Sequence, residues 1–167
     1  GSRSFQDVEV LASGEPAASA TIEEHLRSST AAYEYVLIDC PPSVGPLTQS
    51  ALAASSEVLM PIQCEYFAME GLTQMIHAIR DVMQRPGSCL AFGGIVLTMY
   101  EPELELTGEV ETEVRDFFGE IVFDTVIPRD VTVSEAPSYG QPVLQYTPRS
   151  RGSWAYRELC LEVMDRG

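Results

Sequence analysis

The sequence predicts an α/β fold in which a mostly parallel sheet is flanked by helices. Short apolar runs alternate along the chain with segments of helical periodicity, as is typical of β-α-β units. The run at residues 36–38 is apolar throughout and ends at Asp39, as expected of a strand buried on both faces. The length of 167 residues suits one domain with a sizeable core. We therefore expect a single domain over residues 1–167, with residues 1–4 as a tag remnant or tail.

The first part of the chain is predicted to contain three strands separated by helices. The sequence T-I-E-E at residues 21–24 has the form of a capping box and begins a helix that runs to about residue 29. After the Pro41-Pro42 turn, residues 47–54 form a short helix. The apolar runs predict strands at residues 8–12, 35–39 and 57–62.

The clearest helical pattern follows the third predicted strand. Its apolar residues recur at spacings of three and four, and Pro86-Gly87 ends the helix. The residues in this pattern are Leu72, Met75, Ile76, Ile79, Val82 and Met83.

Two more helices and three more strands are predicted in the rest of the chain. A helix from about Gly108 to Gly119 should turn inward Val110, Val114 and Phe117. A closing helix at residues 153–164 should turn inward Trp154, Leu159 and Val163. The predicted strands are residues 92–97, residues 121–127 before Pro128, and a short one at 142–146.

The charge balance argues against nucleic acid as a ligand. The chain has 25 acidic residues against 10 basic ones, a formal net charge of −15. All the basic residues are arginine, and the sequence contains no lysine. DNA is held largely by Lys and Arg side chains that neutralise its phosphates, so this surface should repel it.

Cysteine and hydropathy patterns indicate a cytoplasmic protein. The four cysteines form no C-x-x-C pair, and we expect reduced, mostly buried thiols. His25 and His77 have no second ligand at metal spacing. No apolar run approaches the roughly 20 residues that cross a bilayer, and no signal peptide opens the chain.

Asp39 is the first candidate for chemistry. It follows a buried strand, and ligands of open α/β sheets bind at the carboxyl ends of strands. In phosphate-loop enzymes an acid in this place holds Mg²⁺. An aspartate that only bonds its own turn gives the same local pattern, so the pattern alone leaves both interpretations open.

Longer strings extend this pattern. The sequence YVLIDCPPSVGPLTQSALAASSEVLMPIQCEYFAMEGLTQM strongly resembles the ParA/Soj family of chromosome- and plasmid-partitioning ATPases, relatives of the MinD cell-division ATPases. The strings GGIVLTMY and TVIPRDVTVSEAPSYGQPVLQYTPRSRGSWAYREL resemble the same family. The resemblance covers nearly the whole chain from about Val8, and it implies a P-loop NTPase-like fold of the ParA/MinD type.

The resemblance also implies roles for particular residues. Asp39 would be the Walker B acid, which contacts Mg²⁺ through water, with a turn behind it formed by Cys40, Pro41 and Pro42. The adenine side of the nucleotide site would include Thr98, Met99, Pro128, Arg129 and Asp130. The loop that follows a strand beside the nucleotide cleft would be Gln63, Cys64 and Glu65.

Two family features are missing from these 167 residues. The lysine-rich phosphate loop, K-G-G-V-G-K-[TS], and the second motif near V-D-x-D-P-Q are both absent, so the match corresponds to about the carboxyl-terminal two-thirds of the family. We therefore expect this chain to be inactive alone, although the intact protein would bind ATP and Mg²⁺. Glu103 and Thr132 also stand at positions where the family often has arginines implicated in DNA binding.

Taken with the residues, the resemblance predicts part of a partitioning ATPase. The intact protein would bind Mg-ATP, dimerise, act with a ParB-like centromere-binding partner and associate with the nucleoid. The alternative is a non-enzymatic remnant that serves as a protein-interaction module. A membrane-cycling, MinD-like role is less favoured, because the chain ends in the acidic sequence ELCLEVMDRG. Without a phosphate-loop strand beside it, residues 35–39 should be covered by other strands or paired in a dimer, and we favour the dimer.

Overall fold

The computed structural model describes residues 22, 24, 26, 30, 32–41, 43, 45–65 and 68–166. The chain divides into two compact units. The first unit comprises residues 1–58 and 71–92, and the second comprises residues 59–70 and 93–167. The predicted strand at residues 8–12 lies outside the described residues. Within the predicted helix at residues 21–29, the described residues Ile22, Glu24 and Leu26 are all helical.

Two helices dominate the described part of the first unit. Helix α3 (Pro46–Ala53) begins after Gly45 and buries Ala51 and Leu52. Helix α4 (Ala68–Met83) buries Leu72, Ile79 and Val82, as its apolar spacing predicts. Both predicted helices are confirmed.

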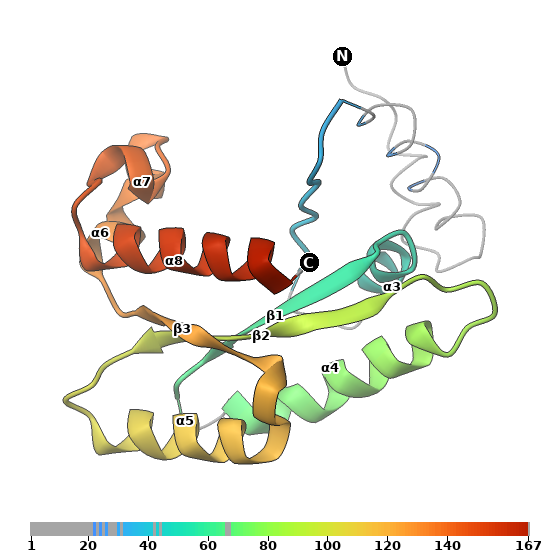
Figure 1. Cartoon of the computed structure of the whole chain (residues 1–167), viewed down its shortest axis with the longest axis horizontal. Coiled ribbons are helices and arrows are strands. Elements are labelled where there is room, and N and C mark those ends of the chain that lie inside the picture. Colours follow the sequence, from blue (N-terminus) through green and yellow to red (C-terminus); the bar gives the residue numbers. More distant parts are fainter. Residues whose placement is uncertain are drawn as a thin grey trace. The chain divides into compact units, whose positions relative to one another are not determined.

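The strands form one sheet in the order β1-β2-β3. They are β1 (Glu57–Gln63), β2 (Ala91–Tyr100) and β3 (Val122–Pro128). Strands β2 and β3 pair in parallel. Helices α5 (Glu105–Phe118) and α8 (Arg151–Arg166) lie on opposite sides of these strands (Figure 1). The predicted parallel sheet flanked by helices is thus confirmed.

The core of the second unit lies between the sheet and α8. Val96, Phe123, Ile127 and Ala155 are buried together, and Leu159 and Val163 of α8 pack against them. Gly94 has a φ of 154°, and a side chain there would collide with the Phe123 ring. Between β3 and α8 the chain forms α6 (Val131–Glu135), a 3₁₀ turn (Ala136–Tyr139) and α7 (Val143–Tyr146).

The prediction of a buried strand at residues 35–39 is wrong. These residues form no regular secondary structure, and all are exposed. Leu37 is 95% exposed. A strand is stabilised by hydrogen bonds to a neighbouring strand, and no strand among the described residues pairs with this segment. An apolar sequence alone does not replace that neighbour.

The prediction of a short strand at residues 142–146 is also wrong, because residues 143–146 are helix α7. Pro142 precedes the helix, and its carbonyl accepts hydrogen bonds from the amides of Gln145 (2.9 Å) and Tyr146 (3.0 Å). These local bonds satisfy the backbone without a partner strand. Five residues are too few for an apolar pattern to distinguish the two structures.

Two predicted inward side chains face solvent, and the cysteines are less buried than predicted. Val110 and Val114 of α5 are buried, but Phe117 is 75% exposed. In α8, Ala155 lies toward the core, so Trp154 turns about 100° away and is 56% exposed. Of the four free cysteines, only Cys64 is buried, whereas the other three are exposed.

Candidate functional site

The carboxyl ends of the three strands bring together most of the predicted site residues, all in the second unit. One loop follows each strand. The predicted residues at these ends are Gln63, Cys64 and Glu65 after β1, Thr98 and Met99 in β2, and Pro128, Arg129 and Asp130 after β3.

Backbone hydrogen bonds connect these ends to one another. The Cys64 amide donates to the Thr98 carbonyl at 2.9 Å, and the Thr98 hydroxyl donates to the Ile62 carbonyl at 3.1 Å. The Arg129 amide donates to the Tyr100 carbonyl at 2.9 Å. The predicted loops therefore meet at one edge of the sheet.

The Arg129 side chain bridges the loops that follow the other two strands. Its Nη2 lies 2.8 Å from Glu65 Oε1, and its Nε lies 2.6 Å from Glu101 Oε1. The Arg129 side chain is 47% exposed, so each ion pair contributes at most about 1 kcal/mol. We call these three residues the edge triad. One arginine paired with two carboxylates leaves this edge with a net negative charge.

Strand β2 is irregular next to the edge triad. Leu97 pairs with Val126 and Tyr100 pairs with Pro128, so β2 advances three residues where β3 advances two. Met99 lies within this bulge and has a φ of 55°, the only positive φ of a non-glycine residue in the described part of the chain. A left-handed residue with a side chain costs about 1–3 kcal/mol, and such conformations concentrate at functional sites.

Asp130 fixes the loop after β3. One carboxylate oxygen accepts from the Thr132 amide (2.9 Å) and hydroxyl (2.8 Å), and the other accepts from the Gly152 amide (2.8 Å). Burial pushes the pKa of Asp130 upward. The bonds from Gly152 and Thr132, with the charge of Arg151, nevertheless hold that pKa below its ordinary value. Gly152 is required at this contact, because a side chain there would collide with Val133.

A second polar group lies beside the same strand ends. Burial and then the negative charge of Glu111 raise the pKa of the Cys64 thiol to about 11. A hydrogen bond with Glu111 raises the pKa of Tyr100. Glu111 is paired at 2.9 Å with Arg115 on the next turn of α5. Cys64 is therefore an inert, packed thiol at neutral pH rather than a nucleophile.

The residues predicted around the Walker B position belong to the first unit. Asp39, Cys40 and Pro41 are exposed in the irregular segment, and Pro42 lies outside the described residues. No three His, Cys, Asp or Glu residues in the described part of the chain are grouped to hold a metal. A single exposed carboxylate does not form a Mg²⁺ site, which needs several oxygen ligands. The described residues therefore do not fit a complete metal site.

Comparison with known proteins places the chain in a family. A family model described as an AAA domain, AAA_31, matches residues 4–92. The chain belongs to this family. It is 47% identical over 135 residues to the sporulation initiation inhibitor protein Soj of Bacillus subtilis, and 50% identical over 134 residues to the chromosome partitioning protein ParA of Caulobacter vibrioides. These matches cover 81% and 80% of this chain but 53% and 50% of the relatives, so the chain spans about half their length.

Solved structures related to this Soj/ParA family chain share its fold. The chain superposes with a TM-score of 0.69 on a cobyrinic acid a,c-diamide synthase from Mycobacterium smegmatis with bound ADP and magnesium, at 29% identity over 86% of this chain and 51% of that one. Against the cell division ATPase MinD of Pyrococcus furiosus the TM-score is 0.71, at 22% identity over 89% and 59% of the two chains. The second likeness shows the fold alone.

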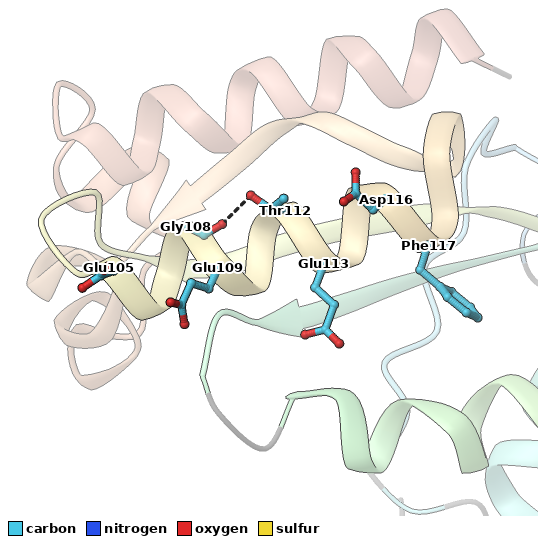
Figure 2. A pocket seen from close by; sticks show the side chains of 7 residues that line it. All are labelled: Glu105, Gly108, Glu109, Thr112, Glu113, Asp116 and Phe117. Atoms are coloured by element: carbon cyan, nitrogen blue, oxygen red, sulfur yellow. Dashed lines mark hydrogen bonds between the residues drawn. The ribbon is translucent and has the colours of Figure 1, made fainter.

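The exposed face of α5 is strongly acidic in this Soj/ParA family chain. Glu105, Glu109, Glu113 and Asp116 lie along it, and Figure 2 shows them around a shallow surface depression that ends at Phe117. Glu109 and Glu113 are exposed, as is typical of a charged helix face in contact with solvent. No helix of the described residues has the length and apolarity to cross a membrane.

Sequence reasoning missed the edge triad and the polar group around Glu111. The contact of Glu101 with Arg129 joins residues 28 positions apart in the chain. No local sequence pattern reports such a contact. The sequence signal that existed was the Pro-Arg-Asp string itself, since a charged pair after a strand end often serves a site.

Proposed function

We propose that this chain forms the base-binding side of a nucleotide site in a chromosome-partitioning ATPase. One observation carries the proposal: the loops after β2 and β3, expected to hold adenine, meet through the bond from the Arg129 amide to the Tyr100 carbonyl. Asp130 then fixes the loop to α6 and α8 through Thr132 and Gly152. A loop held in this way loses little freedom when a ligand binds, which favours affinity.

The charge of this edge suits a base better than a phosphate. The edge triad combines one positive and two negative side chains, and a triphosphate would be repelled by the excess carboxylate. Thr98 and the backbone of Met99 would border the flat ring, and Pro128, Arg129 and Asp130 would cover it. The loop of Gln63, Cys64 and Glu65 would form the neighbouring wall.

The phosphate end of the nucleotide is assigned to other residues of the complete protein. We propose that Asp39 contacts Mg²⁺ through water there, beside the turn of Cys40, Pro41 and Pro42. The family's phosphate loop would supply the remaining contacts, because these 167 residues contain no lysine. On this account the complete gene product binds Mg-ATP and dimerises. Its partner would be a ParB-like protein in chromosome or plasmid segregation.

A second candidate function is a non-enzymatic interaction module. The exposed acidic face of α5 favours it, since such a face can bind a basic protein surface. Calorimetric titration of the complete gene product with Mg-ATP separates the two functions. We expect binding that weakens on Asp39→Asn but not on Asp116→Asn, a control on the exposed face of α5. A complete protein that gives no binding heat with Mg-ATP contradicts the nucleotide proposal and favours the module.

A further inference from the structure

We infer that Met99 is a positioning residue that acts through its backbone rather than its side chain. Its left-handed conformation forms the bulge that brings the end of β2 into register with the loop after β3. This inference rests on the proposed function, because the positioned loops are those assigned to the base. The resemblance to the family suggests instead that the Met99 side chain borders the base.

The register of β2 and β3 shows what the bulge does. From Leu97 to Tyr100, β2 uses one more residue than β3 uses from Val126 to Pro128. After the two extra residues of β3 between Val122 and Val126, this extra residue of β2 leaves Tyr100 opposite Pro128, and the Tyr100 carbonyl then accepts from the amide of the next residue, Arg129. A bulge both bends a strand and redirects the side chains that follow it.

The consequence reaches the edge triad. Glu101 directly follows Tyr100, and it binds Arg129 Nε at 2.6 Å, while Glu65 binds Nη2 at 2.8 Å. In a regular strand, a shift of one residue would turn each following side chain to the opposite face. The left-handed residue therefore directly precedes Tyr100 and Glu101, whose carbonyl and carboxylate bind the amide and the Nε of Arg129.

Backbone and side-chain roles predict opposite results for substitutions at residue 99. Glycine adopts positive φ freely but has no side chain, and asparagine tolerates it better than most residues. Leucine keeps the apolar bulk of methionine. Isoleucine keeps bulk but is β-branched, and such residues are rare outliers at positive φ. A backbone role predicts that Gly and Asn keep the hydrogen bond from the Arg129 amide to the Tyr100 carbonyl and that Ile loses it. A side-chain role predicts that Leu and Ile keep this bond and that Gly loses it.

Hydrogen exchange of the Arg129 amide, measured by NMR in this chain, tests the inference without nucleotide. We expect Met99→Gly and Met99→Asn to change its protection less than about threefold, and Met99→Ile to lower it by about tenfold or more, the cost of a strained left-handed residue. If Met99→Ile does not fold, the test is the order of protection among the other variants. Met99→Gly and Met99→Asn should then protect the Arg129 amide at least as well as Met99→Leu does. Loss of protection in Met99→Gly, or equal protection in all variants, overturns the inference.

A second measurement separates this inference from the proposed function. In the complete gene product, the ratio of ATP to UTP affinity should survive Met99→Gly and fall toward one in Met99→Ile. A wild-type protein that binds neither nucleotide contradicts the proposed function, and the exchange data alone then decide the role of Met99. If ATP selectivity is lost in Met99→Gly but kept in Met99→Ile, the side chain reads the base and the inference fails.

Discussion

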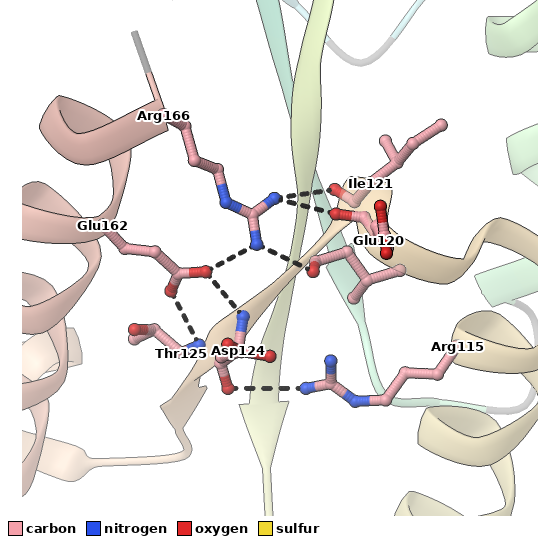
Figure 3. Close-up of polar contacts among 8 residues, drawn as sticks. Arg115, Glu120, Ile121, Asp124, Thr125, Glu162 and Arg166 are labelled. Atoms are coloured by element: carbon pink, nitrogen blue, oxygen red, sulfur yellow. Dashed lines mark hydrogen bonds and ion pairs between the residues drawn. The ribbon is translucent and has the colours of Figure 1, made fainter.

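Glu162 and Arg166, one turn apart on α8, together bind backbone groups of β3 (Figure 3). The Glu162 carboxylate accepts from the amides of Asp124 (2.7 Å) and Thr125 (2.9 Å). Arg166 donates to the carbonyl of Val122 at 3.1 Å and pairs with Glu162 at 2.7 Å. Between Val122 and Val126, β3 advances four residues where β2 advances two, so these side chains bind backbone groups in an irregular stretch of β3.

The first prediction is that Glu162→Gln destabilises the chain by about 2 kcal/mol at pH 7. An amide offers one acceptor where the carboxylate offers two, and its NH₂ group would face a backbone donor. Urea unfolding measures the change. Glu158→Gln is the matched control, because Glu158 is exposed on the same helix and should change stability by less than about 0.5 kcal/mol. Equal effects of the two substitutions contradict the role of Glu162.

This contribution should depend on pH in one direction. Burial raises the pKa of Glu162, but bonds from Thr125 and Asp124 and the charge of Arg166 bring it below its ordinary value of 4.5. A carboxylate with a lowered pKa stabilises the fold fully above the unfolded pKa and loses that effect as pH falls through the folded pKa. The difference in free energy of unfolding between wild type and Glu162→Gln, which we call the stability gap, should therefore be constant near neutral pH and become smaller in acid. A gap that widens below pH 4.5 contradicts this assignment.

The second prediction concerns thiol reactivity. Cys40, Cys89 and Cys160 are exposed, whereas Cys64 is buried and its pKa is raised to about 11. Maleimide at pH 7 should modify the three exposed thiols of the native chain much faster than Cys64, because the thiolate is the reacting form. Mass mapping of the peptides measures each rate, and in urea all four should react. Native labelling of Cys64 as fast as Cys89 would show that the strand ends are open.

The third prediction is weak DNA binding. With a net charge of −15 and acids along α5, few counterions can be released from duplex DNA. Fluorescence anisotropy in physiological salt should show no binding at micromolar protein. Micromolar or tighter affinity that falls steeply with added salt would overturn this prediction.

The fourth prediction is that the isolated chain associates through the segment around Leu37. Three consecutive apolar side chains, Val36, Leu37 and Ile38, are exposed there, and exposed apolar patches promote association. Light scattering should show a dimer that Leu37→Ser weakens. Leu161→Ser is the control, because Leu161 is also exposed, at 63%, on α8. A monomeric wild type, or an equal effect of both substitutions, contradicts the prediction.

The sequence predicted those elements whose pattern is local. The spacing of Leu72, Ile79 and Val82 predicts α4 because an amphipathic helix needs only its own residues and one apolar neighbour surface. Residues 35–39 have an equally clear apolar pattern, yet a strand also needs a partner strand, which the pattern does not report. The predicted strands at residues 57–62, 92–97 and 121–127 have partners in the described sheet and were predicted correctly, whereas residues 35–39 have none there.

The resemblance proposes residues for the candidate site but not their geometry. The resemblance singled out Met99 and Arg129, and both lie at the same sheet edge. The positive φ of Met99 and the contacts of Arg129 with Glu65 and Glu101 depend on the register of β2 and β3, which is set by packing. Likewise, Glu162 binds the amide of Asp124 only once α8 has packed on the sheet, because the two residues are 38 positions apart in the chain.

Photolabelling of the complete gene product with 8-azido-ATP tests the central claim most directly, because the reactive group sits on the base. After proteolysis, the labelled peptides should contain residues 98–101 or 128–130, and excess ATP should prevent the labelling. Labelling confined to other peptides, or no ATP-protected label at all, would contradict a base site at the carboxyl ends of β2 and β3.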